Sequence, residues 1–296
     1  MKRRLRTTLW PVLALVLLLV GCALVPTRTP TPPTSLQVHY IDVGQGDAIL
    51  ILTPEGKAAL IDGGEAGSGA LQYLRNKGVR KLDLVVASNG RSDHLGGLAE
   101  VLKAIPTDEV VSNGQPQTSL AYERFQQAVS KSRARHRVVR RGDSLALGGL
   151  KLDVLSPAPS VKSDSENNQS LVLRLTYGQT AFLFEGDAEK EAEDDMMAAG
   201  LNLNATVLKL GYHGSSTAST LPFLQRVKPV MAVYFAGAGN QWHLPSPSTL
   251  TRLNSLGVQT FGTDINGTIV ITSDGQSCNV TTAKGNGPWV PATPNS

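Results

Sequence analysis

The order of apolar segments predicts an α/β sandwich, with sheets inside and helices outside. Several strand-like runs open the region from residue 36, and strand and helix patterns then alternate as far as about residue 282. Such elements bury their apolar sides when helices cover the outer faces of packed sheets. No internal linker or repeat interrupts these roughly 245 residues, so we expect one domain over residues 36–283.

Glycine-rich turns join the first strands. We expect those strands at Leu36–Val43, Ala48–Leu52 and Ala58–Ile61. The segment Asp42-Val43-Gly44-Gln45-Gly46-Asp47 follows the first strand, and Asp62-Gly63-Gly64 follows the third. Glycines beside carboxylates suit tight turns whose backbone closely approaches another group. A helix is then expected over residues 66–78, ending at Gly78.

The most informative stretch follows that helix. An apolar run over Leu82–Ala87 predicts a buried strand, which stops at the turn signal Asn89-Gly90. A helix pattern opens at Leu95 and continues to Ile105. The pair Asp93-His94 is therefore expected in a loop between a strand and a helix, where rigid scaffolds commonly hold reacting groups.

Alternating elements continue through the rest of the domain. The pattern predicts strands at Glu109–Ser112, Leu171–Thr176, Ala181–Phe184, Val230–Phe235, Val258–Phe261 and Gly267–Thr272, and a further strand that ends before Gly211. Over Arg140–Pro157 it predicts two strands joined by a Gly-Gly turn. It predicts helices at Ser119–Ser130, Ala188–Ala199 and Ser248–Leu256, and another helix that ends near Val227.

The most basic run lies at Lys131–Arg141. It has two interpretations, a patch that contacts phosphates or the solvated face of a strand. Arg133, Arg135 and Arg137 alternate with the period of a strand, which favours the second interpretation.

The segment after Ala87 resembles the metal loop of the metallo-β-lactamase superfamily, His-x-His-x-Asp-His. In that pattern the two leading histidines fall on Asn89 and Arg91, while Asp93 and His94 are retained. The sequence at 40–49 (Tyr-Ile-Asp-Val-Gly-Gln-Gly-Asp-Ala-Ile), Leu-Ile-Asp-Gly-Gly at 60–64 and the segment 140–157 resemble the extracellular domain of ComEC-type competence proteins. The resemblance implies an αββα fold with two mixed sheets inside, and a nuclease connected with DNA uptake.

The same resemblance implies a metal site formed by Asp93, His94, Asp187 and His213. Asp187 takes the place of an aspartate that bridges two metals, although an aspartate before a helix can also serve as an N-cap. His213 lies in a segment where the family has Gly-His-His-Gly-Ser and Tyr212 replaces one histidine. A lone histidine in such a loop is either a ligand or a structural residue.

Four more residues are candidates for a further site: His243, Asn89, Tyr212 and Asp62. The family pattern Asn-x-Tyr-Gly-His-Pro-His-Pro aligns with residues 240–247, and Leu244 and Ser246 take the places of its two histidines. His243 lies one position early. It either reaches the site through a local shift or caps the loop.

These residues favour a metal-dependent hydrolase with one divalent cation, Zn or Mn. Asp93 and Arg91 are the expected catalytic residues, because a guanidinium repels a first metal and offers a two-pronged contact to phosphate. The substrate class is DNA or another phosphodiester. The competing hypothesis is an inactive surface module that binds DNA or an uptake partner; a structural or adhesive protein leaves the four ligands unexplained.

The amino-terminal segment resembles a bacterial lipoprotein leader. Four basic residues precede an apolar run of 12 residues, Leu9–Val20, which is shorter than the roughly 20 residues that span a bilayer. Leu-Val-Gly-Cys then ends at Cys22, the expected lipidation site, although an ordinary signal peptide or an uncleaved anchor would also fit. We therefore expect a signal peptide at 1–21, a linker at 22–35 and a loose tail at 284–296.

The charge distribution argues against reading the net charge as a nucleic-acid signal. The chain of 296 residues has a formal charge of +4, but residues 1–21 carry four basic and no acidic side chains. Without that leader the formal charge is zero. We expect a monomer anchored to the cell envelope on the extracytoplasmic side through Cys22, with any membrane channel supplied by a separate partner.

Overall fold

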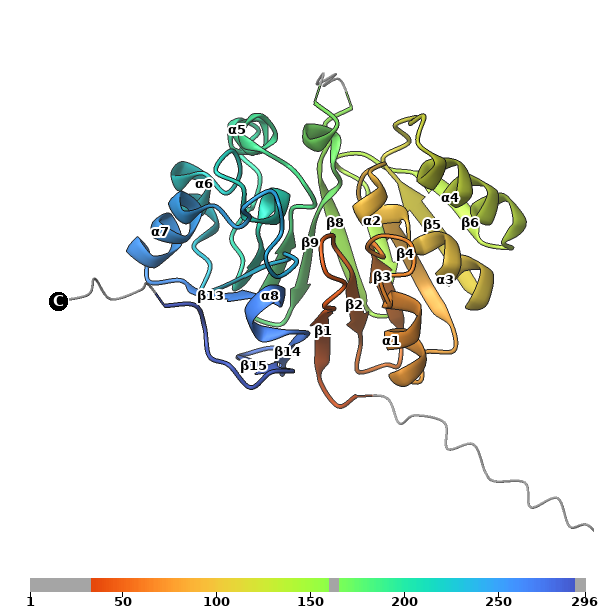
Figure 1. The fold of residues 1–296 in the computed structure, drawn as a ribbon, viewed down its shortest axis with the longest axis horizontal. Coiled ribbons are helices and arrows are strands. Elements are labelled where there is room, and N and C mark those ends of the chain that lie inside the picture. The colour runs from red at the N-terminus through yellow and green to blue at the C-terminus, as the bar shows by residue number, and fades with distance from the viewer. Residues whose placement is uncertain (1–32, 160–164, 291–296) are drawn as a thin grey trace, which may run out of the picture.

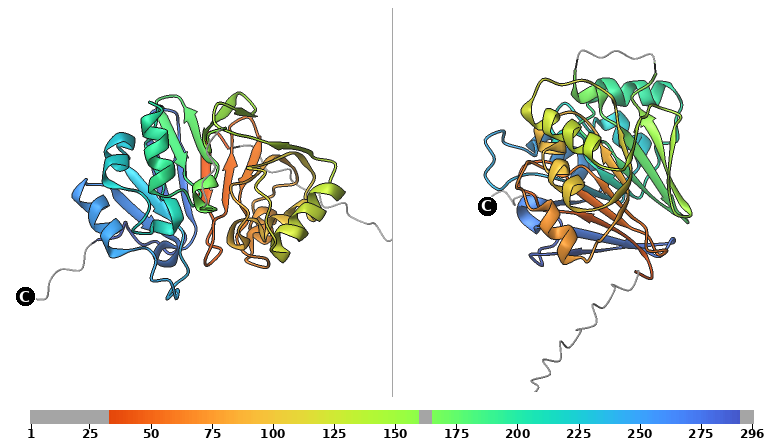
Figure 2. Two further views of the ribbon diagram at one scale, coloured as in Figure 1. Left: turned by 90° about the horizontal axis from the view of Figure 1, so that it is seen from above. Right: turned by 90° about the vertical axis from the view of Figure 1, so that its right-hand side faces the viewer.

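Two mixed β-sheets pack face to face with helices on both outer faces, as Figures 1 and 2 show. This is the arrangement in a computed structural model that describes residues 33–159 and 165–290. The predicted αββα sandwich is confirmed. The expected leader, linker and lipidated Cys22 fall almost entirely outside the described residues.

The first sheet has eight strands in the order β15-β14-β1-β2-β3-β4-β5-β6. The strands β3 to β6 run parallel to one another, whereas the other neighbours in this sheet are antiparallel. Their bounds are β1 Leu36–Tyr40, β2 Ile49–Leu52, β3 Ala58–Ile61, β4 Leu82–Ala87, β5 Thr107–Ser112, β6 Arg135–Val138, β14 Ile269–Ser273 and β15 Cys278–Thr282.

The second sheet has seven strands in the order β13-β12-β11-β10-β9-β8-β7. The strands β10 to β13 are parallel, and β7 to β10 are antiparallel. Their bounds are β7 Ser144–Leu147, β8 Leu150–Ser156, β9 Val172–Tyr177, β10 Thr180–Phe184, β11 Val207–Lys209, β12 Met231–Tyr234 and β13 Gln259–Gly262.

Strand alternation divides the apolar side chains among three layers. In β2, Ile49 and Ile51 point into the core between the sheets, while Leu50 points to the outer helices. The inter-sheet core also includes Phe182 and Phe184 of β10, and Leu183 between them faces the other way. Because successive side chains of a strand point to opposite faces, strands covered on both sides read as continuous apolar runs.

Helices of one half cover each outer face. The outer side of the first sheet packs against α1 Ala70–Asn76, α3 Leu98–Ala104 and α4 Leu120–Lys131. The outer side of the second packs against α5 Lys190–Ala198, α6 Leu221–Val227 and α7 Pro247–Ser255. Figure 1 shows the two groups of helices on opposite sides of the sheets.

Two local expectations about helices were wrong. The helix expected from residue 66 begins at Ala70, after Gly69 with a φ of 97°. The single helix expected over Leu95–Ile105 is split into α2 Ser92–Leu95 and α3, so Asp93 and His94 lie on a short helix and not in a loop. The sequence pattern also missed β15 and the short helix α8 Thr263–Asn266.

The first part of the expected tail is held against the domain. Trp289 N donates to the Thr260 carbonyl at 2.7 Å, and the Asn266 side chain donates to the carbonyls of Asn286 and Gly287. The Trp289 side chain also packs on the outer core of the second sheet. Among the described residues, none of the helices has the length and apolar character needed to cross a bilayer.

Arginines of the basic run form ion pairs within the protein. Arg135 and Arg137 both contact Glu109 at 2.9 Å, and Arg141 contacts Asp195. Arg135 and Arg137 lie on β6, at the edge of the first sheet. The arrangement agrees with the solvated strand face and leaves less free positive charge for a phosphate patch.

Candidate metal centre

Polar side chains meet where parallel strands of both sheets end. Asp62 follows β3, and α2 with Asp93 and His94 follows β4 in the first sheet. In the second sheet, Asp187 follows β10 and His213 follows β11. Figure 1 shows α2 beyond the end of β4, beside the line where the sheets meet. Ligand sites of α/β proteins commonly form at the carboxyl ends of parallel strands.

Asp62 holds the ring of His94 in one orientation. Its Oδ2 lies 2.9 Å from His94 Nδ1 and accepts the Ser88 hydroxyl at 2.6 Å, while its Oδ1 accepts the Ser88 backbone N–H at 2.8 Å. A carboxylate on one ring nitrogen fixes the imidazole and leaves the other nitrogen for a metal. Asp62 is thus an orienting group, and His94 Nε2 points into the centre.

Four side chains surround that centre. His94 Nε2 lies 3.1 Å from Asp187 Oδ2, and His213 Nε2 lies 3.2 Å from Asp93 Oδ2 and 3.6 Å from Asp187 Oδ1. One potential ligand atom from each of these residues lies within 4.8 Å of every other. Two carboxylates and two imidazoles form a donor set suited to zinc or manganese.

Several buried atoms of this cluster lack hydrogen-bond partners within the described chain. They are His94 Nε2, both carboxylate oxygens of Asp187, Asp47 Oδ1, His213 Nδ1 and Arg91 Nε. Asp187 is fully buried, and α5 has Glu189 in its N-cap position, so Asp187 does not cap the helix. Buried polar atoms without partners are costly, and a bound cation would satisfy them. The residues therefore fit a divalent metal.

Close backbone contacts fix the short helix against the first turn. Asp47 N donates to the Asp93 carbonyl at 3.0 Å. Gly46 has a φ of 120°, and a Cβ there would come 2.2 Å from that same carbonyl oxygen. Only glycine satisfies both constraints, which explains the glycine directly before Asp47.

The carboxylates control the protonation of both imidazoles. Burial lowers the pKa of His94, but Asp187, Asp62 and Asp47 outweigh burial and raise it well above its usual value. The same opposition raises the pKa of His213 to about 9, with Asp187, Asp47 and Asp93 as the main partners. Burial opposes the effect at Asp93 also, where His213 and His94 nevertheless lower the pKa of the carboxyl.

The sequence pattern did not single out Asp47 and Lys209 as members of this centre. Both are buried and form an ion pair, and Lys209 Nζ also donates to the Gly186 carbonyl at 2.7 Å. Asp47 Oδ1 lies 3.4 Å from His213 Nδ1. A lysine inside the apolar strand β11 was the available signal, because a buried ammonium requires a partner.

The comparisons with known proteins agree with this geometry. Residues 41–237 match the family described as "Metallo-beta-lactamase superfamily". The chain belongs to this superfamily. A solved structure, the metallo-beta-lactamase fold protein YhfI from Bacillus subtilis, has a TM-score of 0.54 at 13% identity, covering 77% of this chain and 95% of that one. That likeness shows the fold alone.

Curated relatives of this chain include competence proteins. "ComE operon protein 3" of Bacillus subtilis is 31% identical over 253 residues, which are 79% of this chain and 32% of that protein. "Competence protein ComA" of Neisseria gonorrhoeae is 33% identical over 242 residues, 80% of this chain and 32% of that protein. The chain thus spans about a third of the length of these relatives.

Asn89 and Arg91, which stand where the superfamily pattern has its two leading histidines, make contacts of other kinds. The Asn89 amide donates to Ser170 Oγ at 3.3 Å, and its oxygen accepts the Arg91 backbone N–H at 3.0 Å. Arg91 Nε lies 3.4 Å from Asp93 Oδ1 and 3.5 Å from Asp187 Oδ2. A guanidinium therefore faces the two carboxylates from the side where the superfamily pattern has imidazoles.

The other two candidates, Tyr212 and His243, differ in their relation to a pocket of about 230 Å³. Tyr212 lines it, with its ring centroid 6.0 Å from Arg91 Cζ. His213, Asp93 and Arg91 also border the pocket, which therefore opens onto the cluster. The described ranges contain two groups of potential metal ligands, the cluster above and the adjoining group Asp47, Asp62 and His94. His243 is exposed and belongs to neither group, whereas its neighbours Trp242 and Leu244 line the pocket.

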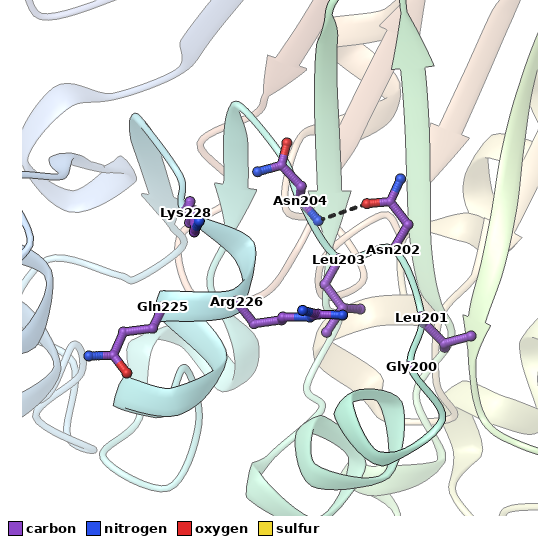
Figure 3. Close-up of a pocket in the computed structure, with 8 residues that line it drawn as sticks. All are labelled: Gly200, Leu201, Asn202, Leu203, Asn204, Gln225, Arg226 and Lys228. Carbon is purple, nitrogen blue, oxygen red and sulfur yellow. Dashed lines mark hydrogen bonds between the residues drawn. The ribbon is translucent and has the colours of Figure 1, made fainter.

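A larger hollow of about 600 Å³ lies elsewhere on the second half, between residues 200–204 and the end of α6. Figure 3 shows its polar lining, including Asn202, Asn204 and Gln225. The residues that line it include no carboxylate, imidazole or thiol, so it lacks the donor set of the centre between the sheets.

Proposed function

We propose that this chain is a metal-dependent phosphodiesterase with a single divalent cation, zinc or manganese. Asp93, His94, Asp187 and His213 would hold the cation. The observation that carries the proposal is the convergence of four buried side chains, with both Asp187 oxygens and His94 Nε2 lacking hydrogen-bond partners in the described residues. When bound, the cation would supply a Lewis acid for phosphate oxygens and an activated water at neutral pH.

The residues around the cation have separate tasks. Arg91 would bind a phosphate oxygen and stabilise the negative charge that grows during displacement, replacing part of a second cation. Asp93 would hold the cation through one oxygen and orient the guanidinium through Oδ1, which lies 3.4 Å from Arg91 Nε. Asp62 would keep the His94 ring in place. The pocket beside Arg91 and Asp93 gives a substrate access to these groups.

DNA is the proposed substrate class, because the relatives named above are competence proteins. A direct test measures hydrolysis of bis(p-nitrophenyl) phosphate and of a DNA oligonucleotide in the presence of Mn²⁺ or Zn²⁺. His94→Ala should abolish turnover. His136→Ala is the matched control, because His136 is exposed on β6 and belongs to neither potential ligand group in the described chain. Equal turnover in the wild type and His94→Ala would contradict the proposal.

The replacement of two ligand positions by Asn89 and Arg91 favours one alternative function. In that alternative the chain binds DNA or an uptake partner at the cell surface without cleaving it. A protein that binds one cation and retains DNA, yet leaves both phosphodiesters intact with Mn²⁺ and Zn²⁺, would fit this alternative.

We propose an extracytoplasmic location at the cell envelope, with lipid attached to Cys22. The support is the leader-like sequence that ends at Cys22. Membrane fractionation tests the anchor: Cys22→Ala should move the protein from the membrane to the soluble fraction.

A further inference from the structure

We propose that Trp242 is a stacking platform for an unpaired nucleobase whose phosphate lies on Arg91. This proposal rests on the phosphodiesterase function above and defines its substrate as a flexible, unpaired nucleic-acid end. The two residues line the same pocket of about 230 Å³, together with Asp93 and His213. The pocket thus joins an aromatic surface, a cation and the candidate metal ligands.

Trp242 is available to a ligand. Trp242 is 57% exposed. It is the one aromatic residue among the exposed large apolar residues of the described chain. An indole left in water while bordering a polar pocket is typical of a recognition surface, since large apolar side chains otherwise gain free energy by burial. Every base has a π-face, so aromatic stacking tolerates any sequence.

Hydrogen bonds hold the loop of Trp242 beside the pocket. The Asn240 amide donates to the Gly237 carbonyl at 3.0 Å and to the Leu244 carbonyl at 2.6 Å, and its oxygen accepts the Leu244 N–H at 3.1 Å. Gly237 N donates to Gln45 Oε1 at 3.2 Å, and Gln45 itself lines the pocket. The platform is therefore tied to the Gly-x-Gly turn that also fixes Asp93.

The charge and size of the pocket select the ligand class. Arg91 contributes a guanidinium to the lining, which lies over the Tyr212 ring and also faces Asp93 and Asp187. A phosphate on Arg91 leaves the attached sugar and base to extend toward Trp242. A base paired in a duplex has its faces covered by neighbouring pairs, so only an unpaired base presents a free face to the indole.

The test measures binding in a chelator, so that turnover plays no part. The full-length chain is titrated with a dT oligonucleotide, with dTMP and with a blunt DNA duplex, following tryptophan fluorescence and anisotropy of a labelled oligonucleotide. The chain has three tryptophans, and Trp289→Phe is the control that leaves Trp242 in place. The single strand should quench the emission of the wild type and of Trp289→Phe, and the duplex should bind much more weakly.

Replacement of the indole gives the decisive comparison. Trp242→Leu should bind the oligonucleotide roughly 5-fold to 100-fold more weakly, because stacking is lost. Trp242→Phe should keep most of the affinity. If Trp242→Leu lowers the affinity for dTMP as much as the affinity for the oligonucleotide, Trp242 stacks on a single base. If it lowers only the affinity for the oligonucleotide, Trp242 supports several nucleotides of the strand. Equal affinity of Trp242→Leu and wild type, or no binding of single strands, would overturn the proposal.

The two proposals fail in different ways. Loss of stacking in Trp242→Leu with no hydrolysis by the wild type would reject the phosphodiesterase and keep the base platform. Normal hydrolysis of bis(p-nitrophenyl) phosphate, which carries no base, by a Trp242→Leu variant with unchanged DNA affinity would reject the platform and keep the enzyme.

Discussion

Two neighbouring parts of the segment between β4 and α3 differ in what their side chains contact. In Asp93-His94, ligand atoms face a common point, and His94 Nε2 has no hydrogen-bond partner in the described chain. In Asn89–Arg91, the Asn89 amide is used by Ser170 and the loop backbone, and Arg91 faces two carboxylates. The first part is prepared for a cation, and the second supplies a fixed cation of its own. Under the proposed function, a partly retained motif would still hold one cation at Asp93, His94, Asp187 and His213.

The largest expected effect is on stability and concerns the buried ion pair of Lys209 and Asp47 beside Asp93-His94. Lys209→Met leaves Asp47 buried without its ammonium partner, which should lower the free energy of unfolding by about 3–5 kcal/mol. Chemical denaturation measures this change. The double variant Lys209→Met, Asp47→Asn should recover much of the loss. A single variant as stable as the wild type would show that the ion pair does not hold this side of the centre.

Acid should weaken metal binding at the prepared part. The pKa of His213 is raised to about 9 in the metal-free protein, so a proton competes with the cation at neutral pH. Affinity should rise about tenfold per pH unit for each imidazole that loses its proton on binding, and therefore up to about 100-fold per unit while both His94 and His213 are protonated. Calorimetric titration with Zn²⁺ or Mn²⁺ in several buffers measures both the affinity and the protons released. A pH-independent affinity would contradict this protonation scheme.

Asp62→Asn tests the support of the His94 ring. Asp62 has a φ of 58°, a conformation that asparagine also tolerates, so the backbone should keep its shape. Loss of the carboxylate should reduce metal affinity by about 10-fold to 100-fold. Asp83→Asn is the control, because Asp83 pairs with Lys57 at 2.9 Å away from the centre. An unchanged affinity would mean that Asp62 does not orient the ligand.

The smallest expected effect is a change in metal count when Asn89 and Arg91 are given metal ligands like those of Asp93-His94. The double variant Asn89→His, Arg91→His replaces a bound amide and a cation with two imidazoles beside Asp187. It should bind a second divalent ion in addition to the first. Arg91→Met, which removes the charge without adding a ligand, should stay at one. Metal analysis of the folded variants decides between these outcomes.

The sequence predicted the sandwich because both sheets contain apolar runs whose spacing and length are local properties. Asp93, His94 and Asp187 could be selected because each follows a strand within a motif. The ion pair between Asp47 and Lys209 could not be predicted, because the two residues belong to different sheets and are far apart in the sequence. The short helix α2 escaped for another reason: four residues are too few to show a helical period.

Whether the four residues hold one ion is decided by counting metal in the full-length protein after reconstitution with Mn²⁺ or Zn²⁺ and removal of excess ion. Native mass spectrometry of the wild type, His94→Ala and the control His136→Ala gives the count for each chain. About one ion is expected in the wild type and in His136→Ala, and none in His94→Ala. Two ions in the wild type, or one retained by His94→Ala, would contradict the single site described for these residues.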